Sequence, residues 1–267
     1  MRKRLIAALT GVAVLAFGGV AFADNVYTVT TGSATPAGKG TTSKPLPVKF
    51  NFGYTVGDTE GLRPSPIEQY RIAPEGLVSY AKLFPACKFS QASGAQLASA
   101  CNKAKVGSGI VLNNAGATTD RTQKLTCNLR LALYNISDAG KNGGLAIRLD
   151  GDPPPPPPGS RTVGCTIGIH TAIKAPFFNV KVDGVKTSEL RFTVPIQLQE
   201  PAPGVQNSVI DTASTVLKKT AKTRIKGKSR TVGFYSEVGC KGKTRTVRVE
   251  FVDQQGRKFT ANKQAKC

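Results

Sequence analysis

Alternation between apolar and polar residues is the feature that most constrains this fold. From Leu46 to Val56 every second residue is apolar, and successive side chains of a β-strand point to opposite faces of a sheet. The same period returns in four later segments, at residues 125–133, 145–149, 163–169 and 190–198. Turns rich in Gly, Pro and Asn separate them. The pattern predicts an all-β protein, an antiparallel sandwich or barrel, and we expect the antiparallel β-sandwich.

Helical periodicity is scarce, and the best candidates for helix are residues 89–101 and 208–219. Pro195 lies on the polar face of the strand predicted at 190–198. Because proline cannot donate a hydrogen bond to a sheet, we expect an edge strand or a bulge there. Residues 245–261 predict a hairpin with Gly256 in its turn.

The N-terminus resembles an export signal. Three basic residues, Arg2 to Arg4, precede an apolar run that ends in Ala21-Phe22-Ala23, which predicts a signal peptide over residues 1–23 and cleavage before Asp24. The alternative is an uncleaved membrane anchor, because the run is about long enough to span a bilayer. We expect a secreted, extracellular protein with no transmembrane span after cleavage, free or held at the cell wall by non-covalent contacts.

Six cysteines follow the predicted signal, and their number is even. In an oxidising compartment this predicts a disulfide framework. Fifteen pairings are possible for six cysteines, and reduced cysteines in the core are a further alternative. We predict the sequential pairing, Cys87–Cys101, Cys127–Cys165 and Cys240–Cys267. Cys127 and Cys165 both fall on apolar faces of predicted strands, so a bridge there would cross the core or join neighbouring strands.

The domain organisation follows from composition. Residues 24–45 are rich in Gly, Ser and Thr and predict a flexible linker, although residues 26–30 could form a short strand. Residues 46–267 predict one large sandwich or two small ones, with a split near 200–207 as the alternative. Six prolines within residues 151–160 predict a stiff surface loop between strands, or else a recognition arm. A basic C-terminal hairpin is predicted at 240–267.

Positive charge is concentrated near the C-terminus. The chain holds 37 Lys and Arg against 16 Asp and Glu, and residues 218–267 hold fifteen against three. Such a field favours binding of polyanions, here an anionic wall polymer or polysaccharide. The alternative is a solvated basic face that binds nothing and only increases solubility. The predicted contacts are Lys218, Lys219, Lys222, Arg224, Lys226, Lys228, Arg230, Lys241, Lys243, Arg245 and Arg248. We expect Arg245 near water while Val247 and Val249 pack inward.

A specific nucleic-acid partner is not expected. The aromatic residues of the basic segment, Phe234, Tyr235, Phe251 and Phe259, have strand-like spacing and are interpreted as core rather than as stacking platforms.

Catalytic signals are weak. His170 is the only histidine, and Ser108 stands between glycines without the full G-x-S-x-G pattern. We therefore predict no catalytic residue, no metal site and no cofactor, and a non-enzymatic protein. The alternatives are a purely structural surface protein or a secreted hydrolase. For the hydrolase, two or more carboxylates would have to meet in a pocket, from the set Asp58, Glu60, Glu68, Asp150, Asp152 and Asp183.

Two segments carry a resemblance. Residues 84–109, FPACKFSQASGAQLASACNKAKVGSG, and the ending from Gly239 to Cys267 resemble segments of uncharacterised exported all-β proteins of actinobacteria. The similarity covers most of residues 46–267. It implies an exported all-β domain with cysteines paired as predicted above, and it carries no known activity.

Overall fold

The computed structural model describes residues 25–267, so the predicted signal and its cleavage point lie outside the described residues. The fold is all-β and antiparallel, as predicted. The strands are β1 Asn25–Thr35, β2 Leu46–Asp58, β3 Ile67–Pro74, β4 Leu77–Ser79, β5 Lys105–Ala117, β6 Leu125–Thr126, β7 Leu129–Ile136, β8 Gly144–Gly151, β9 Ile169–Val182, β10 Val185–Thr193, β11 Val205–Val216, β12 Thr220–Ile225, β13 Lys228–Gly233, β14 Tyr235–Glu237, β15 Thr244–Asp253 and β16 Lys258–Lys266.

Helical segments are short in the described part of the chain. They are the α-helices α1 Phe89–Ser93 and α2 Ile196–Gln199, with the 3-10 turns η1 Ala81–Leu83 and η2 Ser99–Ala104.

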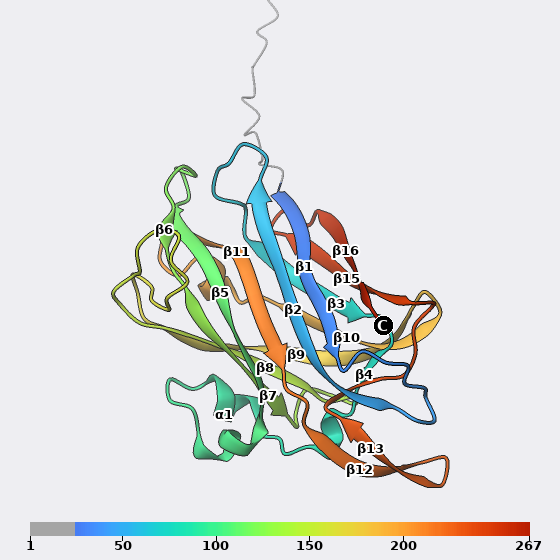
Figure 1. Cartoon of the computed structure of the whole chain (residues 1–267). Helices are drawn as coiled ribbons and strands as arrows, with labels where there is room; N and C mark the ends of the chain where they lie inside the picture. The colour runs from blue at the N-terminus through green and yellow to red at the C-terminus, as the bar shows by residue number, and fades with distance from the viewer. Residues whose placement is uncertain (1–24) are drawn as a thin grey trace, which may run out of the picture.

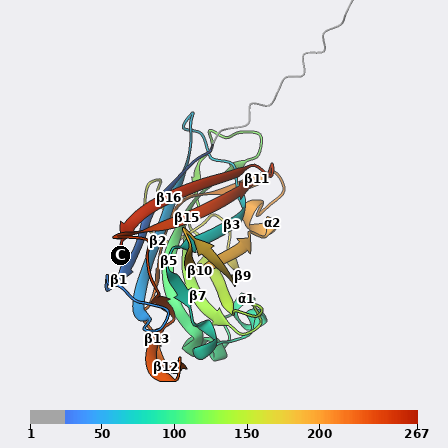
Figure 2. The same ribbon diagram turned by 90° about the vertical axis from the view of Figure 1, so that its right-hand side faces the viewer.

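One long sheet folds over on itself to make both layers of the sandwich. Its strands pair in the order β16-β15-β3-β10-β9-β8-β7-β5-β11-β2-β14-β4, with β1 added beside β2 and β6 beside β5. Figure 1 shows β1, β2, β11 and β5 in front, with β9, β10 and β3 behind them, and Figure 2 shows the two layers from the side. Strands β12 and β13 form a separate two-stranded sheet.

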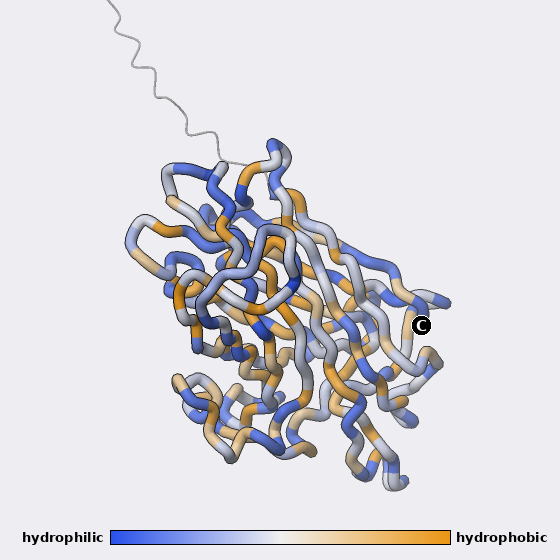
Figure 3. Tube along the Cα trace, turned by 60° about the vertical axis from the view of Figure 1, so that its left-hand side comes forward, coloured by the Kyte–Doolittle hydropathy of each residue, from blue (hydrophilic) through white to orange (hydrophobic). Residues whose placement is uncertain are grey.

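The alternation seen in the sequence builds the core. On β2 the side chains from Val48 to Val56 at every second position are buried, and on β15 Val247, Val249 and Phe251 are fully buried. Hydropathy alternates in the same way along the strands in Figure 3. One apolar cluster includes residues on both sides of segment 200–207, among them Leu198 and Val216, so the chain does not divide into two domains there.

The first strand corrects the linker prediction. Residues 25–35, expected within a flexible linker over 24–45, form β1 and pair with β2 from Asn25 opposite Asp58 to Thr35 opposite Lys49. Val29 and Ala34 are buried in the core. The Gly, Ser and Thr content indicated flexibility, but backbone pairing with β2 stabilises an extended strand whatever the side chains are.

Strand β1 also packs on the last two strands across the sandwich. The Tyr27 ring stacks on Phe251 of β15 at 4.5 Å and lies 4.9 Å from Phe259 of β16, measured between centroids. Further along β1, a Cβ atom on Gly32 would lie 2.5 Å from Cγ2 of Val247. Glycine at this position therefore lets β1 approach β15 closely.

Four segments differ from their predicted structure. Residues 208–219, a helix candidate, belong mostly to β11, which pairs with both β5 and β2. The strand predicted at 163–169 is a connection, and β9 starts only at Ile169. The strand predicted at 190–198 ends at Thr193, because Pro195 begins the short helix α2. The helix candidate 89–101 is only partly helical, as α1 and the start of η2.

The sequential disulfide pairing is confirmed: Cys87–Cys101, Cys127–Cys165 and Cys240–Cys267. The first encloses α1 and part of η2. The second corrects an expectation, because Cys165 lies on the long connection between β8 and β9 rather than on a strand, so the bridge fastens that connection to Cys127 between β6 and β7. The six prolines lie in the same connection. The third bridge holds the C-terminus beside the start of β15.

Candidate functional site

The hairpin formed by β12 and β13, called here the basic hairpin (residues 218–233), projects from the sandwich. Figures 1 and 2 show it at the lower end of the molecule, with its tip directed away from the layers. Its base is anchored, because Val232 is fully buried, Ala221 packs against the main core, and the Phe234 amide donates to the Lys219 carbonyl at 2.9 Å. The strands beyond the base therefore present their side chains to solvent.

The turn of the basic hairpin has an unusual residue. Ile225 pairs with Lys228, which leaves a two-residue turn in which Lys226 has a φ of 50° and Gly227 a φ of 78°. Two positive φ angles define a type I′ turn, whose first position favours Asn, Asp or Gly. The β9–β10 turn has the same form and carries Asp183 and Gly184, with φ of 51° and 84°. The basic hairpin therefore places a lysine where a better turn former would fit.

The charge of the basic hairpin is uniform. Residues 218–233 contain seven Lys or Arg and no Asp or Glu. None of the seven forms an ion pair with any residue in the described range 25–267. Both faces of the hairpin carry cations that are at least partly exposed. Because these cations have no carboxylate partner among residues 25–267, their charge is not neutralised within the described structure.

The strand register sets the spacing of these cations. Lys222 and Arg224 lie on one face of β12, opposite Thr231 and Ser229. Side chains two residues apart on a strand are about 6.8 Å apart, so the two cations form a short row. Hydroxyl groups on the facing strand add neutral hydrogen-bond donors beside this row. An extended chain carrying regularly repeated anions would meet both kinds of group.

The neighbourhood of the basic hairpin contains residues from distant parts of the sequence. The Lys219 ammonium donates to the Lys103 carbonyl at 3.3 Å, and Nε of Arg230 donates to the Ser43 carbonyl at 3.1 Å. These contacts bring exposed Lys44, Lys103 and Lys105 to the hairpin base. Sequence reasoning missed these three lysines, because nothing local marks a residue more than a hundred positions away as a neighbour.

The predicted polymer contacts fall into two groups. Seven of them, from Lys218 to Arg230, belong to the basic hairpin. Lys241, Lys243 and Arg248 are exposed but belong to β15 or the loop before it, and β15 pairs with β3 and β16 in the long sheet. In Figures 1 and 2 the β15–β16 hairpin crosses the upper part of the molecule, away from the basic hairpin. The two groups therefore do not form one row of charge.

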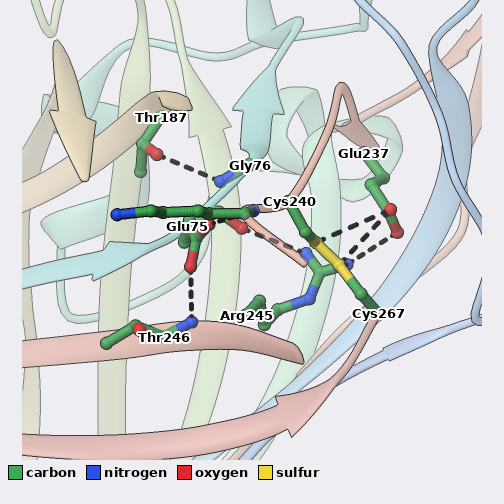
Figure 4. The surroundings of a disulfide bond; sticks show 9 residues. Glu75, Gly76, Thr187, Glu237, Cys240, Arg245, Thr246 and Cys267 are labelled. Carbon is green, nitrogen blue, oxygen red and sulfur yellow. Dashed lines mark hydrogen bonds and ion pairs between the residues drawn. A yellow bond between two sulfur atoms is a disulfide. The ribbon is translucent and has the colours of Figure 1, made fainter. Parts of the chain in front are cut away.

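The prediction that Arg245 is exposed and contacts the polymer is wrong, because its side chain is fully buried. Its Nη2 lies 2.6 Å from Oε2 of the equally buried Glu237, and its Nη1 donates to the Glu75 carbonyl at 3.3 Å (Figure 4). Arg245 lies two positions before Val247, so strand alternation places both side chains on the inner face. The inward direction removes the guanidinium charge of Arg245 from water, and the buried Glu237 carboxylate compensates this charge.

The groups around this ion pair are hydrogen-bonded to one another, although Nε of Arg245 itself has no hydrogen-bond partner among residues 25–267. The Glu75 carboxylate accepts from the amides of Lys241 and Thr246, at 2.7 and 2.8 Å. The only close group of three possible metal ligands among residues 25–267 is Glu237 with Cys240 and Cys267. Both sulfur atoms are joined in a disulfide, and zinc requires thiolates. This region is built as a structural clamp.

His170 lies between two carboxylates on the surface. Its Nδ1 is 3.2 Å from Oδ1 of Asp150, and its Nε2 is 2.8 Å from Oδ1 of Asp152. The hydrogen bond to Asp150, together with that to Asp152, raises the pKa of His170 above its usual value. Both ring nitrogens are therefore occupied, and the residue joins β9 to the start of the proline-containing connection.

The carboxylates of the hydrolase hypothesis do not converge on a pocket. Of the six, Asp150 and Asp152 meet at His170, and Asp58 pairs with Arg121 at 2.8 Å. None of the six lines the large internal cavity formed by the described residues.

Comparison with known proteins gives no relative: no protein-family model, curated protein or solved structure matches the chain. The resemblance to exported actinobacterial proteins therefore stays a prediction. Within residues 25–267, no helix has the length and hydropathy to cross a membrane.

Proposed function

We propose that this protein is a secreted, non-enzymatic component of the cell surface that binds an anionic wall polymer or polysaccharide through the basic hairpin. The observation that carries the proposal is the set of seven cations on one projecting element, with no carboxylate partner among the described residues. The three disulfides support an oxidising, extracellular compartment.

A lysine in the turn adds a second line of support. A left-handed conformation costs an ordinary residue about 1–2 kcal/mol. Lys226 accepts this cost at the tip of the hairpin, where its charge reaches furthest from the body of the protein. Backbone strain that is retained at an exposed position is typical of functional sites.

The test is salt-dependent binding of the oxidised protein to immobilised poly(glycerol phosphate) and to polygalacturonate. We expect retention that falls steeply between about 50 and 200 mM salt, because binding releases counterions from the polymer. The variant Lys222→Gln/Arg224→Gln/Lys228→Gln should lose roughly tenfold or more in affinity and show a shallower salt dependence.

The matched control removes the same charge elsewhere. Arg248→Gln/Lys258→Gln/Lys266→Gln changes three exposed residues of β15 and β16 and should alter affinity by less than about threefold, because distant charges are screened at these salt concentrations. Equal losses in the two variants would show a diffuse field rather than a hairpin site. Retention that ignores salt would contradict polyanion binding altogether.

A further inference from the structure

A cavity of about 120 Å³ lies between the two layers of the sandwich. Protein interiors are close-packed, and voids larger than a water molecule are few. An engineered cavity of about 150 Å³ accommodates benzene. The cavity in this protein therefore has room for a small molecule near that size.

Most of the cavity wall is apolar. Leucine and isoleucine side chains of β7 and β8 form one side, and aromatic side chains of β2, β3 and β10 form much of the rest. No Asp, Glu, Lys, Arg or His lines it. Burial raises the pKa of Tyr54, one of the lining residues, to about 12, so the phenol also stays neutral. A charged ligand would be left without a counterion inside, and an uncharged one is favoured.

Two asparagines supply polar atoms on this wall. Asn113 of β5 is 1% exposed and Asn207 of β11 is 7% exposed. The side-chain NH₂ of Asn113 donates to the Cys127 carbonyl, and that of Asn207 donates to the Leu198 carbonyl, each at 3.0 Å. These bonds fix the amide orientations. The carbonyl oxygen of each side chain has no hydrogen-bond partner among residues 25–267.

The two asparagines that carry these oxygens are neighbours on paired strands. Asn113 pairs with Val209, and Asn207 is two positions from Val209 along β11, so the asparagines form a diagonal cross-strand pair roughly 7–8 Å apart. Gln199 of α2 also lines the cavity, but its amide donates to the Val194 carbonyl and accepts from Gln254. The Thr212 hydroxyl also lines the cavity without a hydrogen-bond partner among residues 25–267, but a hydroxyl can donate as well as accept. The two asparagine oxygens can only accept, and buried acceptors require a donor.

We propose that the cavity binds a small, uncharged, mainly apolar molecule with a hydroxyl group, an alcohol or a phenol, which donates to Asn113 or Asn207. The apolar body occupies the space lined by β7 and β8, and the hydroxyl supplies the missing donor. This site is separate from the basic hairpin and does not depend on polyanion binding.

The test uses 4-fluorophenol and fluorobenzene, which differ in the hydroxyl group, with ¹⁹F NMR of the oxidised protein. Both probes should bind, and 4-fluorophenol should bind roughly three- to tenfold more tightly because of its hydrogen bond. Val111→Phe fills the cavity beside Asn113 and should abolish binding of both probes. Val26→Phe, at an exposed position of β1, is the matched control and should leave binding unchanged.

The wild-type protein gives a second readout that does not depend on any variant folding. Nuclear Overhauser contacts should join 4-fluorophenol to methyl groups of Val111, Leu131 and Ile147. Asn113→Leu/Asn207→Leu should remove the preference for the phenol while fluorobenzene still binds. Failure of both probes to bind, which would mean a cavity for water only, overturns the proposal. Nuclear Overhauser contacts of the probe only to methyl groups outside the cavity would also overturn the proposal. An equal affinity of the wild-type protein for the two probes would do the same.

Discussion

At the residue scale, the basic side chains of this protein serve two different purposes. Three buried arginines stabilise the fold: Arg63 donates to carbonyls of the loop after β5, Arg148 donates to carbonyls around the end of α1, and Arg245 pairs with Glu237. Surface lysines and arginines, by contrast, concentrate on the basic hairpin. The formal charge of the chain includes both kinds of side chain. Burial distinguishes the exposed cations, which are accessible to a polymer, from the buried ones, whose hydrogen bonds and ion pairs stabilise the fold.

A substitution at Lys226 should change turn stability and polymer binding in opposite directions. Lys226→Asn should stabilise the protein by about 1 kcal/mol, because Asn adopts a positive φ more readily than Lys, and should weaken polymer binding. Lys228→Asn is the control, since it removes the same charge from a strand position without relieving a positive φ. Urea denaturation and polymer retention measure the two effects. A stability gain in both variants would mean that charge repulsion, not the turn, limits the hairpin.

His170 makes stability depend on pH in a defined direction. Its pKa is raised in the folded protein by hydrogen bonds to Asp150 and Asp152, so protonation favours folding. This contribution is fully present below the unfolded value of about 6.5 and is lost as the pH rises through the folded pKa.

The measurement is direct because the chain has one histidine. Its ring signals in an NMR titration should give a midpoint above 6.5, and His170→Gln should flatten the fall in stability above that pH. Since the side chain is exposed, we expect a small amplitude. A midpoint below 6.5 would contradict the prediction.

At the scale of secondary-structure elements, close approach of β1 to β15 brings together two strands that lie far apart in the order of the long sheet. The contact is made by the Tyr27 ring stacked on Phe251 and by Gly32 facing Val247. The strands have no backbone pairing with each other in the described structure, so side-chain packing alone holds them. Packing of this kind is sensitive to a single added methyl group.

Gly32→Ala tests this contact. The added Cβ would lie 2.5 Å from Val247 Cγ2, so we expect a loss of about 1–3 kcal/mol in unfolding free energy. Gly57→Ala on the neighbouring β2 is the matched control, because its Cβ would meet nothing within 4 Å, and it should be neutral or slightly stabilising. Val247→Ala should partly rescue Gly32→Ala. Equal effects at Gly32 and Gly57 would exclude a close contact.

At the scale of the whole molecule, the long sheet encloses a cavity and is clamped where its ends meet. At roughly 24 cal/mol per Å³ of closed void, a ligand that filled the 120 Å³ cavity would stabilise the protein by at most about 3 kcal/mol. In the clamp, the Glu237–Arg245 pair joins β14 to β15, and the disulfide Cys240–Cys267 joins the loop after β14 to the end of β16 (Figure 4).

Removal of one partner from the clamp should be costly. Arg245→Met leaves Glu237 buried without a counterion, and we expect a loss of about 3–5 kcal/mol in unfolding free energy. Arg248→Met, an exposed position on the same strand, should stay within about 0.5 kcal/mol of wild type. Adding Glu237→Gln to Arg245→Met should recover part of the loss. A double variant as unstable as the sum of the single ones would show that the two side chains do not interact.

The sequence alone determined the all-β class, about half of the strands, among them β2, β7, β8 and β15, and the excess of positive charge, and it allowed the sequential disulfide pairing as one of fifteen. These depend on local alternation, on cysteine number and order, and on composition. Tertiary structure decided the rest. Strand β1 is ordered because β2 pairs with it, and residues 208–219 are largely extended because β11 lies between two other strands. Strand alternation directs Arg245 inward, but only the Glu237 carboxylate opposite it stabilises a charge there, and Asn113 meets Asn207 because β5 pairs with β11. Each outcome depends on residues far apart in the chain, and local patterns do not encode which of them become neighbours.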